Sequence, residues 1–194
     1  GDRYFEKLTP GTHHIEWRFS NNNGSRVYLE GIGVIALPTI DVNLTEPGSL
    51  GTEILYNVDH LKDVRCLKIK GKMNDDDWDK LKMMTNLFSL DLSETDVTLI
   101  PHNQFDSNRF LHEIILPNTL EEIGSEAFIN SYIQTFKFPK TLKSIGESAF
   151  QDSNITGNVI LPDSMDFIGS NAFDDCDYLT QVTFPKNLKS IPAY

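Results

Sequence analysis

Apolar side chains recur along the C-terminal half of the chain with a nearly constant period. An isoleucine followed by glycine or proline marks each unit, at Ile100, Ile123, Ile145, Ile168 and Ile191, so the spacings are 23, 22, 23 and 23 residues. A phenylalanine follows each of the first four isoleucines by five residues, and a proline precedes each of the last four by six. The isoleucine, phenylalanine and proline positions therefore repeat with the same period, which predicts a stack of similar supersecondary units.

Within each unit, a run of the form apolar-x-x-apolar-x-apolar predicts a strand whose apolar side chains point inward. The runs are Leu87, Leu90 and Leu92; Leu111, Ile114 and Leu116; Ile133, Phe136 and Phe138; and Leu179, Val182 and Phe184. A further run, 155–161, carries one extra residue around Gly157, which predicts a bulge. We predict an elongated solenoid of about six coils, with a parallel sheet on its concave side and turns, short strands and one helix opposite. Strand twist predicts right-handed winding.

Residues 49–84 predict an irregular first end of this array. A short helix is expected over 50–56 and a strand over 64–70. Asn74 is a good helix cap, and the three aspartates that follow it favour the positive N-terminal end of a helix. Trp78, Leu81 and Met84 then share one face of that helix.

Residues 1–48 follow a different pattern, and we place a boundary near residue 48. Alternating residues over 14–19 and 27–30, with an Asn-rich turn over 21–24 between them, predict a β-hairpin. The chain then divides into an N-terminal hairpin or cap, 1–48, and a repeat domain, 49–194. A lone hairpin is marginal in water, so this one either packs on the solenoid or is the remnant of a larger upstream β domain.

The charge of the chain excludes some classes of partner. The 194 residues include 28 acidic and 17 basic side chains, a net charge of −11, and no stretch concentrates the basic ones. Nucleic acid and anionic membrane surfaces are therefore not expected partners. No apolar run reaches the roughly 20 residues that span a bilayer, so membrane insertion is not expected either. Two cysteines are too few for a disulfide framework.

Three repeated segments carry a resemblance to a known family. LPNTLEEIGSEAF, FPKTLKSIGESAF and LPDSMDFIGSNAF resemble the LPxxLxxIGxxAF unit of the BspA-like leucine-rich repeat family, over about residues 85–194. The resemblance implies an α/β, strand-rich leucine-rich-repeat solenoid. It also implies an exported or surface-attached protein of anaerobic bacteria that acts in adhesion and is not an enzyme. The chain departs from the unit at Pro101 and Pro192, which replace the glycine.

A looser resemblance concerns the N-terminal segment. PGTHHIEWRF followed by YLEGIGVI is similar to the last strands of bacterial jelly-roll domains of the carbohydrate-binding type. A complete jelly roll needs about eight strands, so the resemblance does not extend carbohydrate binding to this segment. The alternative is a hairpin that covers the first edge of the solenoid sheet.

The outward side chains of the predicted sheet are the candidate binding site. They form columns across strands about 4.8 Å apart, with mixed charge and two exposed isoleucines, which suits a protein partner. One column begins at Lys68 and the other begins at Cys66 and Ser89. The candidate residues are Lys68, Asp91, Glu113, Ile115, Thr135, Lys137, Asn158, Ile160, Gln181 and Thr183.

Catalysis and metal binding lack their sequence signatures. The chain has no Gly-x-Ser-x-Gly elbow, Gly-rich phosphate loop or His-Glu-x-x-His segment. The acidic clusters at 75–77 and 174–177 lack the spacing of an EF-hand loop, and a helix start and a solvated turn account for them. Cys176 stands where other coils have serine, so it is expected to be a small turn residue. No catalytic residue, metal or cofactor is expected.

The sequence therefore predicts a non-catalytic, adhesion-type binding module of an exported bacterial protein. Its partner would be a host or bacterial surface protein, bound through the sheet, and its location would be secreted or at the cell surface. The alternative is a structural spacer attached to an upstream carbohydrate-binding or glycan-processing domain. The partner's identity and the oligomeric state stay open.

Overall fold

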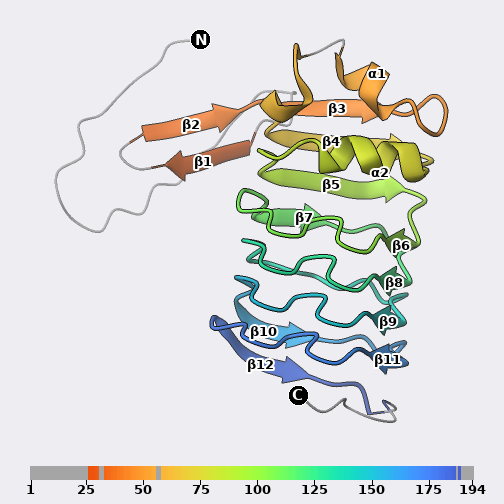
Figure 1. Cartoon of the computed structure of the whole chain (residues 1–194), viewed down its shortest axis with the longest axis vertical. Coiled ribbons are helices and arrows are strands. Elements are labelled where there is room, and N and C mark those ends of the chain that lie inside the picture. The colour runs from red at the N-terminus through yellow and green to blue at the C-terminus, as the bar shows by residue number, and fades with distance from the viewer. Residues whose placement is uncertain (1–25, 31–32, 56–57, 187, 189–194) are drawn as a thin grey trace.

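The coils stack along the longest axis of the molecule (Figure 1). The computed structural model describes residues 26–30, 33–55, 58–186 and 188, and side chains from Pro38 onward. The strand predicted over 14–19, the turn over 21–24 and the last marker, Ile191, lie outside these residues. A strand-rich solenoid with parallel sheets is confirmed. The right-handed winding stays a prediction.

The strands on one side of the stack belong to two parallel sheets. The first has the order β3-β4-β5-β7 and the second pairs β10 with β12. Their bounds are β3 Thr39–Asn43, β4 Cys66–Gly71, β5 Ser89–Thr95, β7 Glu113–Ile115, β10 Gly157–Ile160 and β12 Leu179–Thr183. A single bridge, Glu113 to Thr135, links β7 to the next coil.

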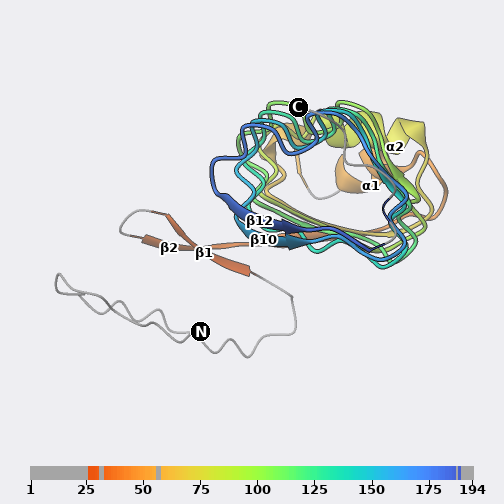
Figure 2. The same cartoon turned by 90° about the horizontal axis from the view of Figure 1, so that it is seen from below.

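A second side of the stack consists of two-residue strands that contain the marker isoleucines. They form a parallel sheet with the order β11-β9-β8-β6. These strands are β6 Leu99–Ile100, β8 Glu122–Ile123, β9 Ser144–Ile145 and β11 Phe167–Ile168. The helical elements are α1 Leu50–Leu55, η1 Leu61–Asp63 and α2 Asp75–Lys82. Seen along the stack, both α-helices lie across the coil from the β10–β12 side (Figure 2).

The start of α2 follows the predicted capping chemistry. The Asn74 side chain accepts a hydrogen bond from the Asp77 amide, and the Asp77 carboxylate accepts one from the Asn74 amide. The fully buried Asp77 also accepts from the amides of Gly48 and Leu50, at 2.7 and 3.0 Å, so one carboxylate ties the two helix starts together. The predicted inner face of α2 is confirmed, because Trp78 and Leu81 are buried.

The core is one continuous set of apolar columns, and its centre is a stack of phenylalanine rings. Phe105, Phe128, Phe150 and Phe173 lie face to face, with successive centroids 5.2, 5.2 and 5.3 Å apart. Phe128 and Phe150 have no exposed surface. The one-per-coil phenylalanine in the sequence is therefore a single buried ladder, as the constant period requires.

The marker glycines are needed because adjacent coils approach closely. A Cβ on Gly146 would lie 2.4 Å from the Ser125 nitrogen, and one on Gly169 would lie 2.3 Å from the Glu147 nitrogen. Both contacts are to backbone, which cannot turn aside. Gly124 meets the coil before it in the same way, with the His102 nitrogen 2.8 Å from a Cβ.

Each turn holds two non-glycine residues in the left-handed backbone region. The first column of such residues contains Asn103, Glu126, Ser148 and Asn171, with φ from 51 to 58°. The second contains Ser107, Asn130, Asp152 and Asp175, with φ from 51 to 55°. The amides of the first three residues in each column donate to carbonyls of the following coil, as in Asp152 to Asp174 at 3.0 Å, so inter-coil bonds support these strained turns.

The N-terminal part of the described chain forms a hairpin followed by the first strand of the main sheet. β1 (Arg26–Glu30) pairs antiparallel with β2 (Gly33–Leu37). β3, which lies inside the range 1–48, pairs parallel with β4. In Figure 1 the hairpin projects beside the stack. The boundary near residue 48 stays a prediction.

Two details of the predicted strands differ. The run 133–138 forms no strand, only the bridge at Thr135. Phe136 and Phe138 fill inward positions there that hold aliphatic side chains in the coils directly before and after. The combined bulk of the two rings explains the loss of strand pairing. In the β10–β12 pair, the register shifts between Gly157 and Asn158, but the residue passed over is Thr180 on β12.

Candidate functional site

The strand register brings the predicted site residues into two adjacent columns. Lys68 pairs with Asp91 and Asp91 with Ile115, while Glu113 pairs with Thr135. At the other end Asn158 pairs with Gln181, and Ile160 with Thr183. We call these side chains, together with Lys137, the sheet face. Neighbouring side chains along each column come from successive coils, as in Lys68, Asp91 and Ile115.

At the N-terminal end of the sheet face, Lys68 and Asp91 belong to a group of ion pairs that also includes the neighbouring Lys70 and Glu94. Lys68 Nζ lies 2.5 Å from Glu94 Oε1 and 3.7 Å from Asp91 Oδ2, and Lys70 Nζ lies 3.3 Å from Glu94 Oε2. The hydrogen bond to Glu94 raises the pKa of Lys68, and the same bond lowers the pKa of Glu94. These exposed pairs contribute little to stability. Because both Lys68 and Lys70 are already paired, neither ammonium group is free to bind an acidic partner.

Two members of the predicted outward column are buried. Cys66 is 1% exposed and Ser89 is 3% exposed, so the second column begins at Glu113 rather than at Cys66. Ser89 Oγ donates to Glu113 Oε2 at 3.1 Å and so holds that carboxylate against the sheet. The sequence period predicted that both side chains point outward. An alternating pattern indicates on which side of the sheet a side chain lies, but not whether other residues cover that side.

The C-terminal half of the sheet face is more exposed and less paired. Ile160 is 70% exposed, and Thr135, Lys137, Asn158, Gln181 and Thr183 are exposed too. Within the described residues, Lys137 has no ion-pair partner. Asn158 Oδ1 accepts from Thr180 Oγ1 at 2.7 Å, which fixes the orientation of that amide.

A groove of about 620 Å³ opens in this half, where the two sheets are separated. The coil at 135–142 and the coil at 157–164 are joined on one side by Thr156 N to Gln134 O, 2.9 Å. They are joined on the other by Asp166 N to Lys143 O, 2.7 Å. Between these bonds, Lys137 and Phe138 have no backbone hydrogen bond in the described part of the chain. The groove lies where strand-to-strand hydrogen bonds would otherwise join these two coils.

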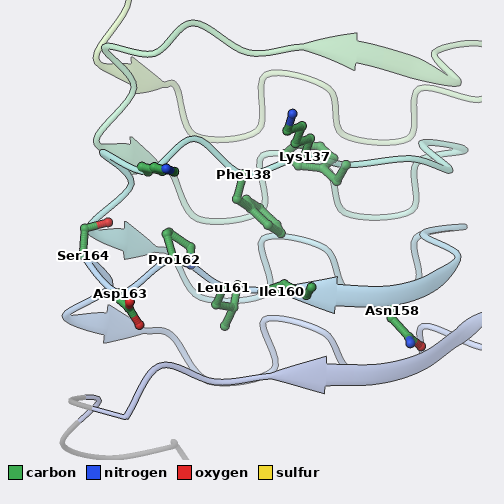
Figure 3. A pocket seen from close by; sticks show the side chains of 10 residues that line it. Lys137, Phe138, Asn158, Ile160, Leu161, Pro162, Asp163 and Ser164 are labelled. Carbon is green, nitrogen blue, oxygen red and sulfur yellow. The ribbon is translucent and has the colours of Figure 1, made fainter.

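The groove is apolar inside and charged at its rim. In Figure 3 the Phe138 ring reaches from its coil toward the end of β10, where Ile160 lies and Leu161 follows. The lining residues are Phe136, Lys137, Phe138, Lys140, Asn158, Ile160, Leu161, Pro162, Asp163 and Ser164. The sequence signal for it was present as two phenylalanines in one run, but their effect on the spacing between coils was not foreseen.

A row of aromatic side chains beside the sheet face was also missed. The Phe88 and His112 rings stack with centroids 4.5 Å apart, and Tyr132 meets His112 edge to face at 6.4 Å. Phe110 and Tyr178 are 49% and 59% exposed. Phe88 and His112 each immediately precede a main-sheet strand, but the same position holds Arg65 and Gln134 in neighbouring coils. Phe110, Tyr132 and Tyr178 lie two residues further back in the repeat, so no single column of the sequence contained this row.

No metal-binding arrangement is found among the described residues. No group of three or more His, Cys, Asp or Glu side chains gathers there as metal ligands would. Cys176 Sγ donates to the Phe150 carbonyl at 3.0 Å, and burial raises the pKa of its thiol. Cys176 packs as the small turn residue that its column predicted. No described helix has the length and apolar content to cross a bilayer.

A family model agrees with this architecture, and two solved structures are similar to the chain. A family model described as BspA type leucine rich repeat region matches residues 45–156 and 98–194, with six copies. A leucine-rich repeat protein from Bacteroides ovatus ATCC 8483 is 23% identical over 60% of this chain, with a TM-score of 0.51. A leucine-rich repeat protein of T. pallidum is 25% identical over 77% of this chain, with a TM-score of 0.44.

This chain spans only part of those two proteins, 30% and 54% of their lengths. No curated protein matches it at a significant level. The likeness to the Bacteroides ovatus protein, at this identity, concerns the fold.

Proposed function

Because the chain belongs to the BspA-type leucine-rich repeat family, we propose that it is a non-catalytic protein-binding module of an exported bacterial protein. It acts in adhesion, at the cell surface or after secretion, and its partner is a host or bacterial surface protein. The sheet face makes the contact.

One observation carries this proposal. Side chains of the sheet face come from successive coils on a scaffold whose strands are held in register, and their C-terminal half exposes Ile160 among polar groups. An apolar anchor surrounded by polar side chains is the usual composition of a protein-binding surface. A rigid array also loses little conformational entropy on binding.

The exposure of the sheet face separates it from the wall of two-residue strands. Those strands contribute only two residues per coil, with the isoleucine of each pair buried. The main sheet offers two outward columns side by side. A partner that spans several coils therefore finds more contiguous contact area on the sheet face.

The test compares two triple variants of the immobilised chain. Glu113→Ala, Ile115→Ala and Lys137→Ala together should weaken capture of extracellular-matrix or bacterial surface proteins without unfolding the array. The matched control, Leu99→Ala, Glu122→Ala and Lys72→Ala, removes the same kinds of side chain outside the sheet face and should leave capture unchanged. Equal capture by both variants would remove the sheet face as the site, and capture of nothing by the parent chain would favour the spacer.

A further inference from the structure

Resting on the proposed protein-binding function, we propose that the groove between the two sheets binds an extended, acidic peptide segment of the partner. The segment carries an apolar side chain flanked by carboxylates. The apolar side chain lies against Phe138, Ile160 and Pro162, and the carboxylates face Lys137 and Lys140.

The charges of the groove favour an acidic ligand. Lys137 and Lys140 are exposed at its rim, and neither has an ion-pair partner among the described residues. By contrast Lys68, Lys70 and Lys143 all pair with glutamates. Asp163 is the one acidic lining residue, so the groove carries two positive charges against one negative charge. This local excess stands out in a chain whose net charge is −11.

The shape of the groove favours an extended peptide over a compact ligand. The groove is open to solvent, and its lining follows β10 and the turn after it, from Asn158 to Ser164. A peptide laid along this line places alternate side chains into the groove and out of it. The backbone groups of Lys137 and Phe138 have no hydrogen-bond partner in the described part of the chain. They are therefore available to the peptide main chain, as in strand-addition recognition.

The apolar floor supplies the affinity that charges alone would not. Exposed charge pairs are each weak and are screened by salt. Ile160, at 70% exposed, has the largest exposed fraction among the large apolar side chains of the described residues. Covering it with an aliphatic or aromatic side chain removes that apolar area from water.

The probes are three fluorescein-labelled peptides of about ten residues, longer when extended than the stretch from Asn158 to Ser164 that lines the groove. The first alternates leucine and glutamate, the second alternates leucine and lysine, and the third alternates serine and glutamate. Fluorescence anisotropy measures their binding to the full chain. The leucine–glutamate peptide should bind, and its affinity should exceed that of each of the other two by about tenfold or more.

Two variants and a control locate the binding. Lys137→Glu with Lys140→Glu should weaken the leucine–glutamate peptide by about tenfold or more and strengthen the leucine–lysine peptide. Ile160→Ser should weaken the first peptide and leave the serine–glutamate peptide unchanged. The control, Lys72→Glu with Lys186→Glu, changes the net charge equally but lies outside the groove, and should change each affinity by no more than about twofold.

Three outcomes would overturn the proposal: no binding of the leucine–glutamate peptide, equal loss in the control variant, or no exchange of peptide preference on charge reversal. These outcomes are separable from failure of the proposed function. A chain that captures a protein through Glu113 and Ile115, yet binds none of the peptides, keeps the sheet face and excludes this groove ligand.

Discussion

The turns between coils depend on residues that accept an unfavourable backbone conformation. Asn and Asp tolerate the left-handed region better than most side chains because they are short and hydrogen-bond locally. Asn103, Asn130 and Asn171 follow this rule, while Glu126 and Ser148 do not. The inter-coil hydrogen bonds of these positions, such as Glu126 N to Glu147 O at 2.9 Å, offset the strain. Single residues in the turns therefore affect stability without contacting the core.

Asp175→Asn should stabilise the fold at neutral pH. The charges of Asp174, Asp152 and Asp177 raise the pKa of Asp175, so its ionised form is disfavoured in the folded chain. An acid with a raised folded pKa lowers stability above that pKa and has no such effect below its unfolded value, about 3.9. The gain in melting temperature should therefore be present at pH 7 and shrink toward pH 3. What remains at pH 3 reports the better fit of asparagine to the left-handed region.

A control separates the cluster from the loss of one negative charge. Asp59→Asn also removes an exposed carboxylate from this acidic chain but lies outside the cluster. Its melting temperature should change less than that of Asp175→Asn. A gain for Asp175→Asn that is the same at pH 3 and pH 7 would contradict the electrostatic explanation.

Cys176 should react slowly with iodoacetamide in the folded chain. Burial raises the pKa of its thiol, and only the thiolate is nucleophilic. At pH 8 the rate, followed by mass spectrometry, should be about tenfold or more below that of the unfolded chain. Fast labelling of the native chain would show that the thiol is not held against the Phe150 carbonyl.

At the scale of elements, the close contact between coils and the phenylalanine ladder keep the stack in register. Both could be predicted from the sequence, because the residues involved recur once per period. In a stack of similar coils, a buried residue that recurs in this way contacts the equivalent residue of the next coil. The Asn74 cap was readable for a different reason, since capping depends only on residues three positions apart.

The groove and the burial of Ser89 could not be predicted in this way. The groove depends on how far two coils separate when Phe136 and Phe138 pack against Phe150, at centroid distances of 4.8 and 5.9 Å. A repeat pattern gives the side on which a residue lies, but the lateral spacing between coils follows from packing volumes. The aromatic row at Phe88 and His112 was missed for another reason, because its residues do not recur at one position of every coil.

Gly146→Ala should lower the free energy of unfolding by about 1–3 kcal/mol or more, because the new methyl group overlaps fixed backbone. Its Cβ would lie 2.4 Å from the Ser125 nitrogen and 2.7 Å from the Gly124 carbonyl carbon. Urea denaturation measures the change. Gly157→Ala is the comparison: nothing lies within 4 Å of its Cβ, so only the strain of its positive φ, about 1–2 kcal/mol, should appear. Equal losses would contradict the contact argument.

Phe150→Ala should destabilise the fold by about 3–5 kcal/mol, since it opens a cavity in the ladder. Phe150 stacks on Phe128 and Phe173 and has no exposed surface. Phe110→Ala removes the same ring from a position that is 49% exposed and should change stability by about 0.5 kcal/mol or less. Chemical denaturation of the two variants gives the comparison, and similar losses would show that the ladder is not the main support.

At the scale of the whole molecule, stability is a property of neighbouring coils. Each coil contacts the ones before and after it, so an interior coil is held on two faces. The amides of Phe128 and Phe150 donate to the following coil at 2.8 and 2.9 Å, in the middle of the stack. Breaking these hydrogen bonds requires the separation of two interior coils, each of which also packs against a further coil on its other face.

Hydrogen exchange of the chain should show this directly. The amides of Phe128 and Phe150 should exchange slowest, and amides of β12, which pairs with only one strand among the described residues, should exchange about tenfold faster or more, because a strand held on one side opens with a lower free energy. Mass spectrometry of peptides after exchange gives the rates. Uniform protection from β4 to β12 would mean that the stack opens only as one cooperative unit.

The repeated glycine contact also means that the interior units are interchangeable. The segment that begins at Gly124 and ends before Gly146 meets each neighbour through the same kind of surface as the next unit does. Duplicating that segment would lengthen the molecule by one coil and repeat the same backbone contact on the wall of two-residue strands, while on the main sheet it would place two copies of the run 133–138 side by side. Changes in the number of such copies, as produced by recombination between them, can therefore vary the reach of the sheet face while its architecture is preserved.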